Sequence, residues 1–230
     1  MKNNIIIALD FDNKNDALNL IEKLDPNRCI LKVGSEMYTL FGPEFVKSLV
    51  KKHFKIFLDL KFYDIPTTVA KSCAAACDLG VWMITVHASG GLPMLVAARN
   101  AIDNHQTAVK PLLIAVTMLT SFKQDDLSNL AITASLEDFV CHLAKTAKTA
   151  RCDGVVASAS EVPMIKELCG TDFLTVTPGI RPANTNLDDQ ARCHTPKEAI
   201  SLGSDYLVIG RPITQSTNPF LVLERLYSDE

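Results

Sequence analysis

One short segment of the chain places three charged side chains close together within otherwise apolar sequence. Asp59 and Lys61 lie in the run Phe57-Leu58-Asp59-Leu60-Lys61-Phe62, and Asp64 follows shortly after it. Side chains of a β-strand alternate between its two faces, so Asp59 and Lys61 share one face while Leu58 lies on the other. A carboxylate and an ammonium group that are buried together must be paired. The segment therefore holds either a structural ion pair or part of a charged catalytic site.

Two further charged residues favour the catalytic interpretation. Lys32 lies within a second apolar run, and Asp10 directly follows a third, Ile5–Leu9. If these runs are neighbouring parallel strands, their charged side chains join the segment that begins at Asp59. Two lysines and three aspartates at one place exceed what a structural ion pair needs, and such clusters are typical of functional sites. We therefore expect an active site at these strand ends.

Two turns that contain glycine and arginine predict an anion site. Thr177-Pro178-Gly179-Ile180-Arg181-Pro182 follows one apolar run, and Ile209-Gly210-Arg211-Pro212 follows the next. Glycine lets the backbone approach a ligand closely, and arginine offers a pair of N–H groups to phosphate oxygens. In (β/α)₈ barrels the loops after the seventh and eighth strands commonly bind phosphate. We expect Arg181, Gly210 and Arg211 to bind phosphate, the alternative being ordinary turns with surface arginines.

A long polar stretch, Arg181–Cys193, separates the first of these turns from the next predicted helix. It is rich in Asn, Asp, Thr and Pro, as binding loops and lids commonly are, although a disordered insertion has the same composition. Gln190, near its end, is a candidate to contact a base or a phosphate. Thr120 and Ser121 follow the fifth apolar run and are expected at the same mouth.

The elements that must position these residues alternate regularly along the chain. Short apolar runs predict strands at Ile5–Leu9, Cys29–Val33, Lys55–Leu60, Val81–Val86, Leu112–Thr117, Gly154–Ala157, Phe173–Val176 and Tyr206–Ile209. Between them lie amphipathic stretches, such as Ala17, Leu20, Ile21 and Leu24, with helical spacing. Eight buried parallel strands that alternate with helices predict a closed (β/α)₈ barrel of the α/β class rather than an open sheet.

Capping residues support the predicted helices. Pro66 is expected to open a helix that Gly80 ends. Thr195-Pro196-Lys197-Glu198 forms a capping box with proline at the first helical position, and Ser135-Leu136-Glu137-Asp138 resembles a second cap. The sequence shows no linker, low-complexity tract or obvious repeat. We therefore expect residues 1–230 to form a single barrel domain.

Composition excludes several classes of protein. The chain is 47% hydrophobic with a formal net charge of −3, so it can bury a large core and gives no reason to expect nucleic acid as a partner. Its first apolar run is too short for a signal peptide or a membrane span.

Seven scattered cysteines, an odd number, predict reduced core thiols in a cytoplasmic protein. The Cys73 and Cys77 pair lacks a second pair, and His87 ends a predicted strand without a partner histidine, so we expect no metal.

At these residues the sequence resembles the orotidine 5′-monophosphate decarboxylase family, and in particular its bacterial branch. The family's hallmark, Asp-x-Lys-x-x-Asp followed by Ile-Pro, is present as Asp59-Leu60-Lys61-Phe62-Tyr63-Asp64-Ile65-Pro66. Further matching segments run in the family's order through nearly the whole chain: Ala8-Leu9-Asp10, Lys32-Val33-Gly34, His87-Ala88-Ser89-Gly90-Gly91, Thr117–Ser121, Thr177-Pro178-Gly179-Ile180-Arg181-Pro182 and Gly210-Arg211-Pro212. The resemblance implies a barrel that removes carbon dioxide from orotidine 5′-monophosphate to leave UMP, without a cofactor.

The resemblance also implies a role for each charged residue. Lys61 would donate a proton to the pyrimidine carbon that loses its carboxylate, and Asp59 would lie beside that carboxylate. Lys32 would orient Asp59 and a ribose hydroxyl, and Asp10 would bind the ribose. A carbanion formed at this ring carbon has no adjacent carbonyl to delocalise it, so the site must stabilise its charge electrostatically.

The remaining implied roles concern the ends of the ligand and a second subunit. Thr120 would contact the base, and the phosphate would be bound or covered by Arg181, Gln190, Gly210 and Arg211. Asp64 and Thr68 would reach into the active site of the partner subunit in a homodimer with shared sites.

Two other functions remain open at this point. A related phosphate-binding barrel, such as a magnesium-dependent keto-sugar-phosphate decarboxylase or a pentose-phosphate epimerase, shares the fold and sometimes the Asp-x-Lys-x-x-Asp string. Such enzymes need metal ligands at strand ends, where this chain has Lys32. A catalytically inactive barrel that only binds nucleotide is the second alternative, and the complete charged cluster argues against it.

Overall fold

Eight parallel strands close into a barrel in the computed structural model, which describes residues 4–107, 109–181 and 194–228. The strands are β1 (Ile5–Ala8), β2 (Ile30–Gly34), β3 (Ile56–Phe62), β4 (Met83–His87), β5 (Leu112–Val116), β6 (Gly154–Val156), β7 (Leu174–Thr177) and β8 (Tyr206–Ile209). Each strand pairs with its neighbours in sequence, and β8 pairs with β1. The predicted fold class is confirmed, and the strand bounds agree with the sequence to within two residues.

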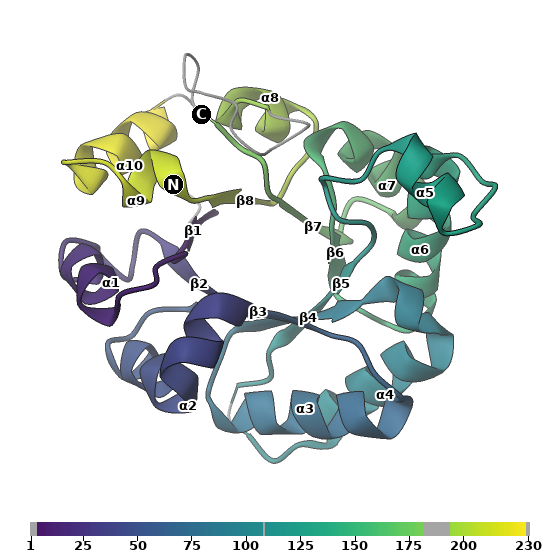
Figure 1. Cartoon of the computed structure of the whole chain (residues 1–230), viewed down its shortest axis with the longest axis horizontal. Coiled ribbons are helices and arrows are strands. Elements are labelled where there is room, and N and C mark those ends of the chain that lie inside the picture. The colour runs from purple at the N-terminus through teal and green to yellow at the C-terminus, as the bar shows by residue number, and fades with distance from the viewer. Residues whose placement is uncertain (1–3, 108, 182–193, 229–230) are drawn as a thin grey trace.

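Helices surround this ring of strands, as Figure 1 shows. They are α1 (Lys14–Ile21), α2 (Ser35–Lys51), α3 (Pro66–Asp78), α4 (Gly91–Asn104), α5 (Gln124–Asn129), α6 (Leu136–Thr149), α7 (Val162–Cys169), α8 (Pro196–Ser201), α9 (Arg211–Thr214) and α10 (Pro219–Ser228), with short 3₁₀ turns η1 (Ala88–Gly90) and η2 (Ala159–Glu161). Every strand is followed by at least one helix before the next strand begins. This alternation places all carboxyl-terminal strand ends at one mouth of the barrel.

The predicted helix caps are present. Thr195 accepts a hydrogen bond from the Glu198 amide at 3.2 Å, and the Glu198 carboxylate accepts one from the Thr195 amide at 2.7 Å, so α8 begins with a capping box. The Ser135 hydroxyl likewise accepts from the Asp138 amide at the start of α6. Gly80 follows α3 with φ at +72°, the left-handed conformation that ends many helices.

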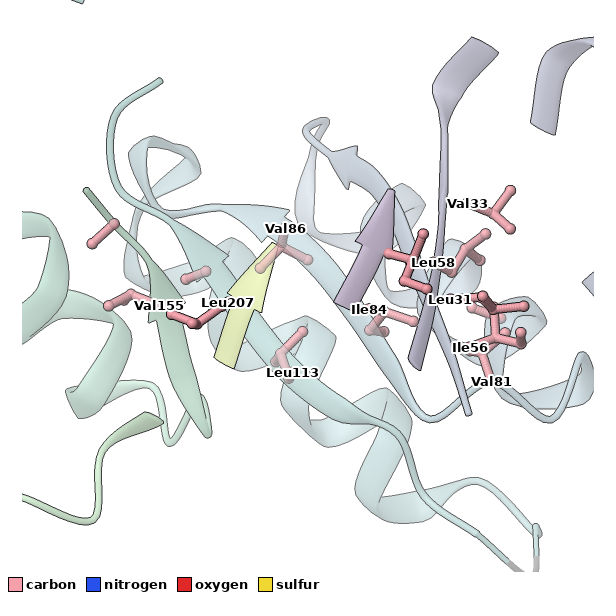
Figure 2. Close-up of a cluster of buried hydrophobic side chains, with 14 of the residues drawn as sticks. Leu31, Val33, Ile56, Leu58, Val81, Ile84, Val86, Leu113, Val155 and Leu207 are labelled. Carbon is pink, nitrogen blue, oxygen red and sulfur yellow. The ribbon is translucent and has the colours of Figure 1, made fainter. Parts of the chain in front are cut away.

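The strand side chains form two apolar layers because they alternate in direction. One layer fills the barrel: Ile6, Ala8, Ile30, Phe57, Met83, Ile114, Val116, Val156, Val176 and Val208. The other packs between the barrel and the helices, and Figure 2 shows part of it, including Leu31 and Val33 of β2 and Ile56 and Leu58 of β3. The core is therefore continuous around the strands, and it holds their ends in fixed positions.

Aromatic and aliphatic side chains close the amino-terminal end of the barrel. Trp82 and Tyr206 meet edge to face there, with ring centroids 5.2 Å apart. Leu112 and Leu174, at the starts of β5 and β7, pack against the same interior cluster. A large cavity lies at the carboxyl-terminal end of the barrel.

The cysteines of the described residues are all free thiols, as the sequence predicts, and all but Cys141 are buried. Burial raises the pKa of Cys29, Cys73 and Cys152 to about 12. Cys193 lies outside the described residues. No helix in the described part of the chain is long and apolar enough to cross a membrane.

Candidate active site

A cavity of about 560 Å³ opens at the carboxyl-terminal mouth of the barrel. Its floor is apolar and comes from the barrel interior, with Phe57, Val116, Val156, Val176 and Val208. Its walls carry Gly210 and polar residues that lie near the carboxyl-terminal ends of the strands or follow them: Asp10, Lys32, Asp59, Lys61, Thr120, Arg181, Arg211, Thr214 and Gln215. The cavity thus combines an apolar floor with a charged rim, as small-molecule sites commonly do.

The centre of the site is a short chain of alternating charges. Lys61 Nζ lies 2.7 Å from Asp59 Oδ2, and Lys32 Nζ lies 3.8 Å from the same oxygen and 3.3 Å from Asp10 Oδ1. Asp59 is buried, whereas the Lys61 side chain remains 32% exposed toward the cavity. The structure therefore brings together four of the five charged residues that the sequence assigned to one mouth, and Asp64 is not among them.

The lack of a side chain at Gly34 leaves room for the Lys32 amine at the end of β2. A Cβ atom added to Gly34 would lie 3.3 Å from Lys32 Nζ, closer than most such contacts. Glycine at this position lets the ammonium group pass the backbone and reach Asp10 and Asp59. Asp10 itself is largely exposed and faces the open part of the mouth.

Strand β3 departs from a regular ladder where it carries the catalytic candidates. Leu58 pairs with Ile84 and Phe62 pairs with Val86, so β3 advances four residues while β4 advances two. Lys61 lies in this bulge with φ at +50°, a left-handed conformation that residues other than glycine rarely adopt. Asp59 and Lys61 still face the cavity together, as predicted, but the strand between them is bent rather than regular.

A threonine that the sequence reasoning missed supports this bulge. The Lys61 amide donates a hydrogen bond to Thr85 Oγ1 at 2.9 Å, and the Thr85 hydroxyl donates to Asp59 Oδ1, also at 2.9 Å. Thr85 is completely buried in β4. Alternation along β4 from Met83, which faces the barrel interior, was the one sequence signal that pointed to its direction.

Arg181, in the turn after β7, lines the cavity and has an N–H group without a hydrogen-bond partner among the described residues. Arg181 is buried, its Nη1 donates to the Ile180 carbonyl at 3.0 Å, and its Nε has no hydrogen-bond partner among the described residues. A buried guanidinium N–H without a partner is costly unless a ligand accepts from it. Arg181 is therefore suited to an anion.

The second predicted arginine lies across the same rim. Arg211 begins the short helix α9 directly after Gly210, and Thr214 and Gln215 line the cavity one turn later. The sequence reasoning missed Thr214 and Gln215, although their spacing from Arg211 is that of one helical face. Gln190 and residues 182–193 of the predicted lid lie outside the described residues.

Asp64 and Thr68 do not line the cavity of their own chain. Both are exposed, and Asp64 Oδ1 accepts a hydrogen bond from the Ile65 amide at 2.6 Å. The large apolar side chains of Tyr63 and Ile65 beside them are also exposed, at 61% and 64%. The structure therefore separates these residues from the Asp59 and Lys61 pair, at the outer side of the β3–α3 junction.

His87 lies at the end of β4 behind the charged cluster. Burial, with a smaller contribution from the positive charge of Lys61, lowers its pKa, and the Tyr63 ring packs edge-on against it with centroids 5.6 Å apart. Within the ranges that the structure describes, no three His, Cys, Asp or Glu side chains are grouped to hold a metal ion. The neutral imidazole thus packs as an aromatic group.

Comparisons with known proteins agree with this geometry. Residues 3–226 match the model of the orotidine 5′-phosphate decarboxylase / HUMPS family. An orotidine 5′-phosphate decarboxylase of Legionella pneumophila is 58% identical over 225 residues, 98% of each chain, and one of Vibrio cholerae is 53% identical over 97% of this chain and 96% of its own. The crystal structure of the orotidine 5′-phosphate decarboxylase of Lactobacillus acidophilus has a TM-score of 0.89 at 39% identity and covers 99% of both chains. The chain therefore belongs to the orotidine 5′-phosphate decarboxylase / HUMPS family.

Proposed function

We propose that this protein converts orotidine 5′-monophosphate to UMP and carbon dioxide in pyrimidine biosynthesis, using no cofactor. The observation that carries the proposal is the Lys61 ammonium, held 2.7 Å from Asp59 and still partly open to the cavity. Such a group can stabilise a developing negative charge and then supply a proton to it. The relatives that carry this activity in their names are more than half identical along nearly the full chain.

The proposed reaction needs one bond cleavage and one proton transfer. The bond between the pyrimidine carbon and its carboxylate breaks, carbon dioxide leaves, and the electron pair stays on the ring carbon. A proton from Lys61 Nζ then forms the new C–H bond, and the neutral amine recovers a proton from water. Before cleavage the negative charge of Asp59 repels the substrate carboxylate, and this repulsion ends when carbon dioxide leaves.

The other residues bind the two ends of the nucleotide in this proposal. Lys32 orients Asp59 and a ribose hydroxyl, and Asp10 accepts from the ribose. Thr120 contacts the base over the apolar floor of the cavity. Arg181, Gln190, Gly210 and Arg211 bind or cover the phosphate, so that binding energy from the distant phosphate supports the chemistry at the base.

We further propose that the enzyme works as a cytoplasmic homodimer with shared active sites. Asp64 and Thr68, which lie outside their own cavity, would enter the site of the partner subunit. The exposed Tyr63 and Ile65 beside them offer apolar surface for such a contact. Large exposed apolar side chains are common at interfaces between subunits.

The alternative of a magnesium-dependent keto-sugar-phosphate decarboxylase requires a divalent metal, and the charges of this site disfavour one. The Lys32 ammonium lies between the carboxylates of Asp10 and Asp59. A cation already occupies the place where carboxylates would otherwise bind a divalent metal, and two cations there would repel each other. The intact Asp59 and Lys61 pair equally disfavours a barrel that only binds nucleotide.

Turnover of orotidine 5′-monophosphate in the presence of EDTA tests the proposal. We expect the ultraviolet absorbance of the substrate to fall at the same rate with and without the chelator. A protein that binds UMP but leaves the substrate intact would be a binding barrel. Activity that EDTA abolishes and magnesium restores would support the metal-dependent alternative.

A further inference from the structure

We infer that Thr85 is a positioning residue for the proposed decarboxylation, because its single hydroxyl group fixes both the backbone of Lys61 and the carboxylate of Asp59. This inference rests on the proposed function. Thr85 is fully buried in β4 and does not line the cavity, so it acts only through these two residues. Both of its contacts are hydrogen bonds of 2.9 Å.

The direction of each hydrogen bond is fixed by chemistry. The Lys61 amide can only donate, so Thr85 Oγ1 must accept from it. The hydroxyl group has one proton, which is then directed at Asp59 Oδ1. Asp59 Oδ1 is thereby engaged on the buried side, and Oδ2 is left for Lys61 at 2.7 Å and Lys32 at 3.8 Å. Thr85 therefore fixes the orientation of the Asp59 carboxylate relative to the two ammonium groups.

The same hydroxyl group stabilises the unusual backbone at Lys61. Because β3 bulges between Leu58 and Phe62, the Lys61 amide is displaced from the regular ladder with β4. The Thr85 hydroxyl takes the place of a strand carbonyl as its acceptor. A left-handed residue costs on the order of 1–3 kcal/mol and persists only where its surroundings hold it. Without this acceptor, the bulge that directs Lys61 into the cavity loses its main polar contact.

The substitution Thr85→Val tests this role, since valine keeps the shape of threonine and removes the hydroxyl group. We expect kcat to fall by roughly 10²-fold, because a displacement of about 1 Å at a reacting group has that effect. KM for orotidine 5′-monophosphate should change little, since the ribose and phosphate contacts come from other strands. Thr85→Ser should recover most of the lost kcat, because serine has the same donor and acceptor capacity.

Thr175 of β7 provides a matched control. It is also fully buried, and its hydroxyl accepts from the Asp205 amide at 3.2 Å and donates to Asp205 Oδ2 at 3.0 Å. Thr175 does not line the cavity. Thr175→Val thus removes the same kind of hydroxyl group from the same kind of contacts, and we expect it to lower stability while leaving kcat near that of the wild type.

Three results would overturn the role of Thr85: a native kcat in Thr85→Val, no recovery in Thr85→Ser, or an equal loss of kcat in Thr175→Val. Urea titration of each variant shows whether it is folded under the conditions of the assay, so that a loss of kcat is not mistaken for unfolding. Wild-type turnover, measured first, tests the proposed function on its own. An inactive wild type would contradict the proposed function. An active wild type with an equally active Thr85→Val would contradict only the role of Thr85.

Discussion

Lys61 combines two properties that oppose each other in most lysines. Its ammonium group is ion-paired at 2.7 Å, yet a third of its side chain remains accessible from the cavity. A fully buried pair would be inert toward a ligand, and a fully exposed lysine would be neither aligned nor desolvated. Lys61 combines both properties while its backbone is left-handed, with φ at +50°.

Replacement of Lys61 by alanine tests whether this arrangement is catalytic. We expect Lys61→Ala to reduce turnover by several orders of magnitude, because charge stabilisation and proton donation are lost together. The fold and the affinity for UMP should largely survive. Lys55→Ala is the control, since Lys55 lies over the Trp82 ring at the opposite end of the barrel. Near-native turnover of purified Lys61→Ala would rule out the mechanism.

Arg211 allows the phosphate end of the site to be tested separately. Arg211→Ala should raise KM and reduce kcat/KM by roughly 3 kcal/mol, as expected for loss of a charge-assisted contact. Orotidine, which lacks the phosphate, is the control substrate, and the deficit should shrink greatly with it. An equal deficit with both substrates would show that Arg211 does not act on the phosphate.

The predicted directions of the charged side chains are confirmed where strand alternation alone decides them. Asp59 and Lys61 share the inward face, and Lys32 and Asp10 meet them because neighbouring parallel strands end together. Thr85 could not be predicted, because its importance comes from a bulge in the adjacent strand. The charge pattern placed Asp64 at the same mouth, whereas the family resemblance implied a position outside its own site, and Asp64 does not line its own cavity.

At the scale of elements, the β3–α3 junction has two faces. Its inner face carries the Asp59 and Lys61 pair, and its outer face carries Asp64 and Thr68. A short connection before Pro66, the first residue of α3, separates the two. A single junction could therefore serve two active sites in a symmetric dimer.

Mixing two inactive variants tests this arrangement. Lys61→Ala and Asp64→Asn are prepared as separate homodimers and combined under conditions in which subunits exchange. In each heterodimer one site carries both substitutions and the other is intact, so random mixing should restore about a quarter of wild-type activity. Native mass spectrometry confirms the exchange. If heterodimers form without any activity, Asp64 acts within its own chain.

Elements with a local sequence signal were predictable, and elements without one were not. Strands such as Tyr206–Ile209 and the capped helices follow from apolar runs and capping residues that are local in the sequence. The 3₁₀ turns η1 and η2 and the four-residue helix α9 have too few residues for any periodicity to show. The kink in α2 at Gly42, where φ is +66°, also went unpredicted, although glycine before Pro43 is a local signal for it.

At the scale of the whole molecule, the buried thiols predict how stability depends on pH. The pKa values of Cys29, Cys73 and Cys152 are raised from 9.0 to about 12, because burial disfavours the thiolate. A group with a raised pKa in the folded state stabilises the fold fully below its unfolded pKa, and this contribution is lost as pH rises toward the folded pKa. Stability should therefore decrease between about pH 9 and pH 12.

Urea unfolding across this range measures the effect. Lysines and tyrosines titrate in the same window, so Cys152→Ala is the control that isolates one thiol. The free energy of unfolding of the wild type relative to this variant should fall as pH rises above about 9. A difference that stays constant with pH would show that the Cys152 thiol does not ionise on unfolding.

The apolar closure at the amino-terminal end of the barrel has a consequence for the order of events in turnover. Trp82, Tyr206 and the leucines beside them pack at that end, whereas the residues that line the cavity lie toward the opposite mouth. We infer that orotidine 5′-monophosphate enters and UMP leaves through this same mouth. On this inference carbon dioxide can leave while UMP is still bound, whereas a new substrate molecule can enter only after UMP has left. We therefore expect UMP to inhibit competitively, so that added UMP raises the apparent KM for orotidine 5′-monophosphate and leaves kcat unchanged.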